Sequence, residues 1–322
     1  MRAVQVLAPG RAEFVDTPIP ELKPGHALVR TRQLSLCGSD VHMLHYAPAE
    51  HYPFPPGTSG HEMVGVVEAV DAPGSGIEVG NVALTLAPGH CAMAEYYLAP
   101  VEHVLPLPPG KPSEQLLQAQ QLGTVIYACK RLPNVLGLDV AVIGQGSAGL
   151  WFDVMLRRMG ARRVMGLDLQ EHRLAAAHLY GATHTINART SDPIQAVKEI
   201  LGGDLPDVVV EAAGEEDAIK MAVGLARAQG DVLFFGVPRM QYVTFDYRAL
   251  FFKYLRMISV CDASSETNQA STRQALDLIA SGQIDVAPVL THTFPFDQVM
   301  DAYELQRTPN EGAIKIVVEM PS

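Results

Sequence analysis

Cysteine is scarce in this sequence, and other marks of specialised protein classes are missing too. The four cysteines among the 322 residues lie far apart and form no C-x-x-C pair, so a disulfide framework is not expected. No apolar run is long enough to cross a bilayer, and no cationic and apolar leader follows Met1. We therefore expect a soluble cytoplasmic protein.

Basic residues are fewer than acidic residues. The 24 Lys and Arg residues face 35 Asp and Glu residues, which gives a formal net charge of −11. This balance argues against nucleic acid or an anionic membrane as the main partner. The sequence shows no internal repeat and no low-complexity segment. Its length and its hydrophobic content of 48% suit two globular domains, each able to bury a core.

The first 120 residues have the pattern of short strands and turns. Apolar or alternating runs at 1–7, 27–32 and 63–70 are bounded by turn-forming pairs such as Pro24-Gly25 and Pro73-Gly74. This punctuation predicts a mainly β, barrel-like domain.

The pattern changes near Gln120, where strands begin to alternate with helices. The segment 125–132 looks helical, and six apolar strands are expected at 139–143, 163–168, 184–187, 207–211, 231–236 and 256–260. Near-continuous apolar strands joined by helices predict a parallel sheet covered on both faces, and so an α/β chain. After a helix at about 267–281, strand-like runs at 291–294 and 314–319 could rejoin the first domain.

A glycine-rich loop follows the first of these strands. Gly144-Gln145-Gly146-Ser147-Ala148-Gly149 has the G-x-G-x-x-G spacing and opens a helix. The glycines permit a tight turn, a close approach of the backbone to a pyrophosphate, and close packing of the helix on the strand. The phosphates then bind the free N–H groups at the helix N-terminus. The loop predicts a dinucleotide site.

Residues at or after the ends of later strands are expected to add further contacts to the predicted dinucleotide site. Asp168 can accept hydrogen bonds from a ribose diol and would repel a 2′-phosphate, so NAD is expected over NADP. Arg173, five residues later, leaves NADP open. Ala213 in one turn, and Gly236 with Val237 in the next, lie where ligands bind in such sheets.

Three side chains in the first domain can bind one transition metal. Cys37 supplies a thiolate, His61 an imidazole and Glu62 a carboxylate. Three protein ligands with an open position are typical of catalytic zinc, and Asp40 could orient His61 by accepting its other N–H. A metal site together with a dinucleotide loop predicts hydride chemistry at a metal-bound oxygen.

The segments 37–42 (Cys-Gly-Ser-Asp-Val-His), 60–67 (Gly-His-Glu-Met-Val-Gly-Val-Val) and 144–149 together resemble the zinc-dependent medium-chain alcohol/polyol dehydrogenases. The resemblance covers essentially the whole chain. It implies a GroES-like catalytic domain over 1–122 and 264–322, and a Rossmann dinucleotide-binding domain over 123–263.

The same resemblance assigns chemical roles. It makes Cys37, His61 and Glu62 the zinc site, with Ser39 handing the alcohol proton toward a cofactor ribose hydroxyl and His42 passing it to solvent. A secondary alcohol or polyol is the expected substrate, because sorbitol-type members are similar and the 42–51 loop is polar. Oligomers are usual in the family, and edge pairing of a strand near 256–261 would give a homodimer; a homotetramer stays open.

Two departures from the family pattern concern the metal. The four-cysteine lobe that binds a structural zinc should lie near 82–94, where this chain has only Cys91, so one zinc per chain is expected. A further Cys or Glu usually precedes the helix leading into the Rossmann domain. Gln120 stands there, and a neutral amide is a poor zinc ligand, so it is expected behind the ligands or weakly bound.

Other residues are expected to be structural. Trp151 is expected to pack in the Rossmann domain, Lys315 to be a surface lysine, and His90 has no positional argument for a site. Three alternative functions stay open: a zinc-free quinone or enoyl reductase of the same superfamily, an enzyme that recycles bound NAD, and a non-catalytic NAD-binding protein. The joint presence of the three ligands counts against the first, and Ser39 with His42 counts against the last.

Overall fold

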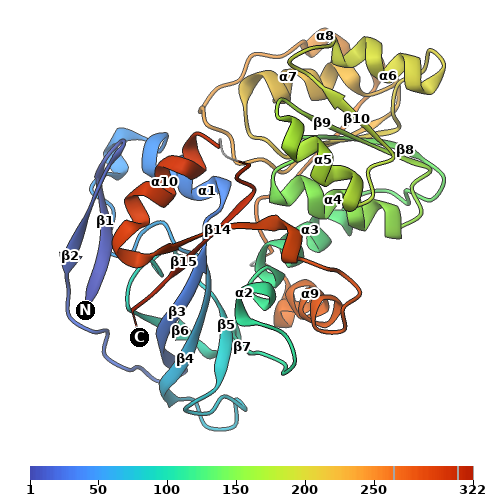
Figure 1. Cartoon of the computed structure of the whole chain (residues 1–322). Helices are drawn as coiled ribbons and strands as arrows, with labels where there is room; N and C mark the ends of the chain where they lie inside the picture. Colours follow the sequence, from blue (N-terminus) through green and yellow to red (C-terminus); the bar gives the residue numbers. More distant parts are fainter. Residues whose placement is uncertain (264, 310–311, 322) are drawn as a thin grey trace. The chain divides into compact units, whose positions relative to one another are not determined.

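The computed structural model of the chain describes residues 1–263, 265–309 and 312–321. The chain divides into two compact units, shown in Figure 1. The first unit joins Met1–Gly123 to Ser264–Ser322, and the second is Thr124–Ala263.

The first unit is built on a largely antiparallel sheet with the strand order β14-β15-β3-β4-β5-β7, and β6 also pairs with β3. A separate hairpin is formed by β1 and β2. The strands are β1 (Arg2–Ala8), β2 (Arg11–Asp16), β3 (His26–Ser35), β4 (Glu62–Asp71), β5 (Val82–Leu86), β6 (Tyr96–Pro100), β7 (Val104–Pro106), β14 (Leu290–Pro295) and β15 (Lys315–Glu319). Because β15 pairs antiparallel with β3, the run at 314–319 does rejoin the β-rich part of the chain.

Short helices accompany these strands. They are α1 (Gly38–His45), η1 (Ala49–His51), η2 (Val101–His103), α2 (Ser113–Leu116), α3 (Ala119–Cys129), η3 (Thr267–Gln269), α9 (Ala270–Ala280), η4 (Ala287–Val289), η5 (Phe296–Gln298) and α10 (Val299–Arg307). One of them, α3, continues past Gly123 into the second unit. The expected helix at 125–132 therefore begins earlier and ends at Cys129. Leu132 precedes Pro133, and a residue before proline is disfavoured in helical conformation.

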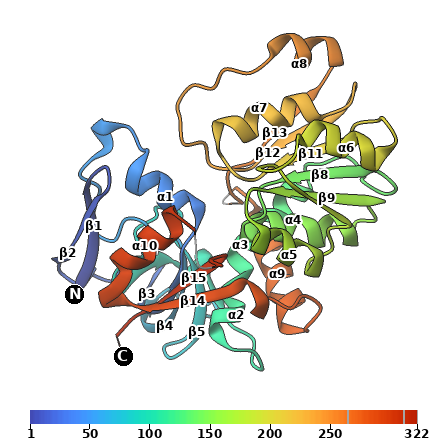
Figure 2. The ribbon, with the colours of Figure 1, turned by 45° about the horizontal axis from the view of Figure 1, so that its top comes forward.

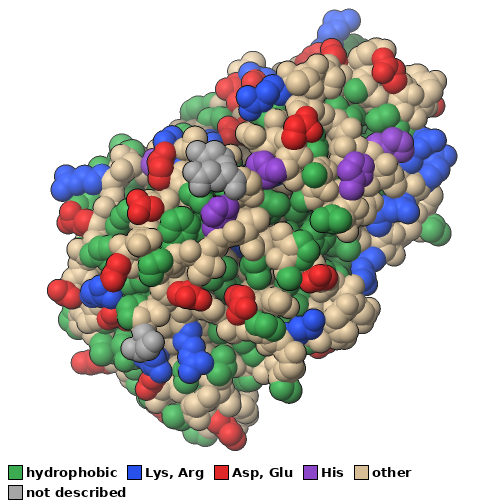
Figure 3. Space-filling model, in the orientation of Figure 1, with side chains coloured by type: hydrophobic (Ala, Val, Ile, Leu, Met, Phe, Trp, Pro, Cys, Tyr) green, Lys and Arg blue, Asp and Glu red, His purple; other side chains and the backbone are tan. Residues whose placement is uncertain are grey.

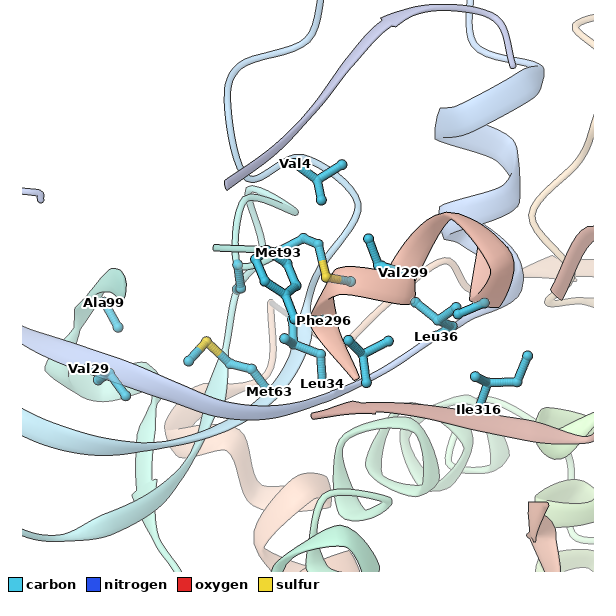
Figure 4. Packing of buried hydrophobic residues seen from close by; sticks show 14 of the residues in the cluster. Val4, Val29, Leu34, Leu36, Met63, Met93, Ala99, Phe296, Val299 and Ile316 are labelled. Atoms are coloured by element: carbon cyan, nitrogen blue, oxygen red, sulfur yellow. The ribbon is translucent and has the colours of Figure 1, made fainter. Parts of the chain in front are cut away.

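The core of the first unit lies between the sheet and the β1–β2 hairpin, with α10 packed against it. Figure 4 shows Phe296 and Val299 among side chains from the strands, including Leu34 and Met63. All four side chains are buried. Helix α10 runs beside α1 (Figure 1), so the core supports the helix that carries the motif 37–42.

The second unit is a six-stranded parallel sheet, as the sequence predicted. Its strand order is β10-β9-β8-β11-β12-β13. The strands are β8 (Asp139–Ile143), β9 (Arg163–Asp168), β10 (His184–Asn187), β11 (Val208–Glu211), β12 (Asp231–Phe234) and β13 (Arg256–Ser259). Each begins and ends within two residues of its expected bounds.

Helices cover both faces of this sheet. They are α4 (Ser147–Arg158), α5 (Glu171–Leu179), α6 (Pro193–Leu201), α7 (Glu216–Leu225) and α8 (Tyr247–Lys253). Figure 2 shows α4 and α5 on one face and α6 and α7 on the other. Trp151 is fully buried, with its ring edge-on to Tyr180 at a centroid distance of 5.4 Å, which confirms its packing role.

The molecular surface carries both signs of charge. On the face drawn in Figure 3, acidic and basic side chains are interspersed, as expected for a chain without an excess of lysine and arginine. None of the helices in the described ranges is both long and apolar enough to cross a bilayer.

Candidate metal centre and dinucleotide loop

The three expected metal ligands converge in the first unit. Cys37 is the residue before α1, His61 precedes β4, and Glu62 begins β4. Glu62 pairs across the sheet with Ser35 at the end of β3, which places Cys37 next to the start of β4. The candidate ligand atoms of Cys37, His61 and Glu62 all lie within 4.8 Å of one another. Sheet register thus assembles the predicted set.

Asp40 lies next to two of the candidate ligands, Cys37 and His61. Its Oδ2 accepts a hydrogen bond of 2.7 Å from the backbone N–H of Cys37 and so fixes the start of α1. Its Oδ1 lies 3.5 Å from Nδ1 of His61, while Nε2 of His61 lies 3.8 Å from Oε1 of Glu62. Asp40 thus faces His61, and its expected role of orienting that imidazole stays a prediction.

The thiol and the imidazole influence each other's protonation. Burial lowers the pKa of His61, but Asp40 and then Cys37 raise it, and the net pKa lies well above its usual value. Burial and Glu62 raise the pKa of Cys37, but the hydrogen bond with His61 and the charge of Lys315 lower it, and the net pKa is lowered. The pair therefore favours a thiolate beside an imidazolium, and a metal ion would displace the imidazolium proton.

Glu62 is already bound by two side chains of the same unit. Lys315 on β15 places its Nζ 2.7 Å from Oε2 and 3.0 Å from Oε1, and the Ser35 hydroxyl also donates to Glu62. Both Lys315 and Glu62 are 0% exposed. The expectation of a surface lysine is therefore wrong, because the pairing of β15 with β3 buries Lys315 against a carboxylate that lies 253 residues earlier.

Ser39 and His42 lie three residues apart on α1, a spacing that puts them on the same face of the helix. Both side chains are half-buried. Within the described parts of the chain, the Ser39 hydroxyl oxygen is buried without a hydrogen-bond partner, so it is available to a ligand. Their expected role in proton transfer stays a prediction.

Two residues near the metal ligands were missed by sequence reasoning. Gln121 donates its side-chain N–H toward the sulfur of Cys37, with an Nε2–Sγ distance of 3.4 Å. The amide is buried and can stabilise the negative charge on the thiolate. His90 is the second, because its ring lies 4.3 Å from the ring of His61 between centroids. A contact between Gln120 and the metal stays a prediction.

The glycine-rich loop of the second unit follows β8 and begins α4 at Ser147. Gly144 has φ +91°, a conformation that favours glycine, and its N–H donates to Leu167. A Cβ on Gly149 would collide with the carbonyl oxygen of Gly144, so no other residue fits without a shift of the backbone. The loop and helix start have the form expected for a pyrophosphate site, where the first N–H groups of α4 are available.

Asp168 lies directly beside this loop at the end of β9. Its Oδ2 accepts a hydrogen bond of 2.7 Å from the backbone N–H of Gln145, and its Oδ1 accepts from Leu169 and Gln170. Arg173 lies 3.9 Å from Oδ2 of Asp168. Burial lowers the pKa of Arg173, Asp168 raises it, and the net pKa is lowered. The acidic and basic residues expected to choose between NAD and NADP thus lie next to each other.

The two later turns of the sheet also meet. Oε1 of Glu211, at the end of β11, accepts hydrogen bonds of 2.7 Å each from the backbone N–H groups of Ala213 and Gly214. A Cβ on Gly236 would collide with Gly214, and Gly214 in turn lies against the backbone of Val237. The expected residues Ala213, Gly236 and Val237 are therefore neighbours at the carboxyl edge of the sheet, where ligands bind in this class of fold.

Family models match both units. Residues 23–109 match the alcohol dehydrogenase GroES-like domain, and residues 149–281 match the zinc-binding dehydrogenase domain, so that together they cover more than half of the chain. The chain belongs to the zinc-dependent alcohol dehydrogenase family. The comparisons agree with the predicted fold and family. They also agree with the predicted class of enzyme, which oxidises or reduces CH–OH groups of small alcohols with a nicotinamide cofactor.

Curated relatives of this dehydrogenase act on several alcohols. An alcohol dehydrogenase of Cupriavidus necator is 27% identical over 99% of this chain and 98% of its own length. L-threonine 3-dehydrogenase of Bacillus subtilis is 28% identical over 95% of both chains. Sorbitol dehydrogenase 1 of Saccharomyces cerevisiae is 26% identical over 97% of this chain and 96% of its own.

Solved structures support the same fold. Alcohol dehydrogenase TADH from Thermus sp. ATN1 is 26% identical, covers 100% of both chains and has a TM-score of 0.83. A zinc-binding dehydrogenase from Sinorhizobium meliloti 1021, bound to NADP, is 25% identical, with a TM-score of 0.81 over 99% of this chain and 98% of its own.

Proposed function

We propose that this dehydrogenase oxidises a secondary alcohol or a polyol, with one zinc ion held by Cys37, His61 and Glu62 and with NAD as the hydride acceptor. The observation that carries the proposal is the convergence of thiolate, imidazole and carboxylate within 4.8 Å in a chain that also has a dinucleotide loop. The donor set fits zinc, because sulfur, nitrogen and oxygen ligands with an open fourth position are typical of its catalytic sites.

The residues of the chain fit zinc electrostatically as well. The lowered pKa of Cys37 favours the thiolate that a metal needs, and the Gln121 amide supports that charge. Asp40 would orient His61, and Lys315 with Ser35 holds Glu62 in place. A bound zinc would supply a Lewis acid that lowers the pKa of a substrate hydroxyl.

The chain's own side chains would then move the proton and hold the cofactor. Ser39 would accept the proton of the substrate hydroxyl, and His42, one turn later on α1, would release it to solvent. Glycine-loop N–H groups at the start of α4 would bind the pyrophosphate. Asp168 would accept hydrogen bonds from the adenosine ribose, which supports NAD over NADP, although the neighbouring Arg173 offers a cation to a 2′-phosphate.

A polyol substrate is supported by polar side chains at the end of α1 and in the residues after it. Residues 42–51 include four groups that can hydrogen-bond a polyhydroxylated molecule: His45, Tyr46, Glu50 and His51. A relative named for sorbitol supports the same class, whereas the relatives named for threonine show that other secondary alcohols are accepted in the family.

A homodimer is supported by the exposed edge of the second unit. Strand β13 pairs only with β12 among the described strands, so its other edge can pair with another chain. The preceding helix α8 exposes Tyr247, Phe251 and Phe252, and Tyr254 follows it. We propose edge pairing of β13 between two copies, and sedimentation equilibrium of the full chain tests it. A cytoplasmic location stays a prediction.

The first experiment measures zinc per chain in protein purified without chelator, together with NAD reduction against a panel of polyols and secondary alcohols. We expect about one zinc per chain. Cobalt-substituted protein should show a thiolate-to-metal charge-transfer band, and Cys37→Ser should lose this band and turnover while it still binds NAD. Cys261→Ser is the matched control, because that cysteine is exposed and does not belong to the set formed by Cys37, His61 and Glu62.

Three outcomes would contradict the proposal. Normal turnover of Cys37→Ser would exclude the thiolate as a ligand. Zinc-free wild-type protein that still binds NAD would instead favour a zinc-free reductase or an NAD-binding protein. Protein that holds NAD through purification without net reduction of added NAD would favour recycling of the cofactor.

A further inference from the structure

We propose that the chain has a second cation site, formed by Asp40, His61 and His90, which takes a divalent transition metal such as zinc. One carboxylate oxygen of Asp40 and one ring nitrogen each of His61 and His90 lie within 4.8 Å of one another. Two imidazoles with one carboxylate form a donor set that binds zinc and other first-row divalent ions. The site contains no thiolate, which separates it chemically from the set formed by Cys37, His61 and Glu62.

The fold holds His90 firmly in this place. The segment 87–91 folds against 57–61, because the N–H of Ser59 donates to the carbonyl of His90 at 2.9 Å and the N–H of Ala92 donates to Gly60 at 2.9 Å. A third hydrogen bond, from the N–H of His90 to the carbonyl of Ala87 at 2.8 Å, closes the turn. His90 adopts φ +51°, a conformation uncommon for residues other than glycine. The short loop therefore directs this imidazole against His61.

The other two residues of the site, Asp40 and His61, each have a buried polar atom to which a cation could bind. Asp40 is 0% exposed and His61 is 9% exposed. Oδ2 of Asp40 accepts from the Cys37 N–H. The other oxygen of Asp40, Oδ1, and Nδ1 of His61 face each other at 3.5 Å, which is longer than a normal hydrogen bond, and across the described residues neither atom has a hydrogen-bond partner. Buried polar atoms are rarely left in this state.

The spacing of these atoms suits a bound ion. Oδ1 of Asp40 and Nδ1 of His61 are 3.5 Å apart. Two ligands that each lie about 2 Å from a tetrahedral zinc are separated by roughly 3.3 Å. Only a small adjustment is therefore needed for both atoms to bind the same ion.

The two metal sets share His61 but use different nitrogens. Nδ1 of His61 faces Asp40, and Nε2 lies 3.8 Å from Glu62. A neutral imidazole has one lone pair for a metal, so an ion on Nδ1 competes with an ion on Nε2. The second site can therefore bind an ion when metal binding by Cys37, His61 and Glu62 is weakened. This inference does not depend on the proposed alcohol oxidation.

The test compares metal binding in full-length Cys37→Ser protein, where the thiolate set is lost. Zinc is titrated by competition with a chromophoric chelator, and cobalt binding is followed by its visible absorption. We expect Cys37→Ser to bind one zinc per chain, with a cobalt spectrum that lacks thiolate charge transfer. Adding His90→Ala should weaken this zinc binding at least tenfold, whereas adding His51→Ala, at an exposed histidine of the 42–51 segment, should not.

Two results would overturn the second site. One is Cys37→Ser protein that binds no zinc, and the other is equal zinc affinity with and without His90→Ala. Circular dichroism verifies folding, and Cys37→Ala provides a second background if the serine variant does not fold. The proposed function is judged separately, because it fails if wild-type cobalt protein shows no thiolate band, whatever Cys37→Ser binds.

Discussion

Replacing Lys315 with methionine should strongly destabilise the protein, because it leaves the Glu62 carboxylate buried without its cation. Lys315 and Glu62 are both 0% exposed, and Nζ lies 2.7 Å and 3.0 Å from the two carboxylate oxygens. Removing one partner of a buried ion pair costs about 3–5 kcal/mol of unfolding free energy. For a unit of this size, each kcal/mol lowers the melting temperature by about 2–4 °C, which gives a shift of roughly 6–20 °C.

The assay is thermal and urea unfolding of metal-free protein, so that bound metal does not mask the change. Lys315→Met with Glu62→Gln should recover most of the lost stability, because the double variant no longer buries an unpaired charge. Lys23→Met, at an exposed lysine of the same unit, is the matched control and should melt like wild type. A loss of less than about 1 kcal/mol in Lys315→Met, or a double variant no more stable than the single one, would refute the reasoning.

Three further changes test the second unit. Asp168→Ala should reduce the preference for NAD over NADP in kcat/KM, and an unchanged ratio would show that this carboxylate does not select the cofactor. Gly149→Ala should weaken NADH binding at least tenfold in a fluorescence titration, because the added methyl collides with Gly144; wild-type affinity would exclude this packing. Asp153 is fully buried, neither of its oxygens has a hydrogen-bond partner among the described residues, and burial raises its pKa well above the usual value. Its contribution to stability is therefore full below about pH 4 and is lost as pH rises through the folded-state pKa. Asp153→Asn should gain stability relative to wild type as pH rises, and a pH-independent difference in melting temperature between pH 4 and 9 would contradict this.

The sheet of the second unit could be predicted closely from sequence. Its four inner strands, β8, β9, β11 and β12, are short and mostly buried apolar runs, and such runs are visible without knowledge of tertiary contacts. Helix α8 was not predicted, because its exposed aromatic residues give no apolar face directed toward a core. The α10 helix also escaped prediction, since it is short and its buried side is defined by packing against the sheet of the first unit.

The metal site was predicted only in part. Residues that belong to a local sequence pattern were predicted, and residues that reach the site through tertiary contacts were not. Cys37, His61 and Glu62 were expected together because their types and spacing match a known pattern. Lys315 and His90 were not, because strand pairing and a short loop bring them to the site, and neither pairing is encoded locally. Gln121 was not expected at the site, because its contact with Cys37 depends on how α3 packs against the start of α1, which the sequence pattern does not show.

The first unit is built from two segments that are separated in the sequence by the whole second unit, and this has a consequence for biosynthesis. Glu62 leaves the ribosome long before its buried partner Lys315, and all of Thr124–Ala263 is made in between. The second unit contains every strand of its own sheet, so it can fold while β3 still lacks its neighbour β15. The Glu62 carboxylate therefore lacks its cation during most of translation, and this ion pair forms only after β15 has been added. A nascent chain stopped before Lys315 would hold a finished dinucleotide loop and an unfinished metal centre.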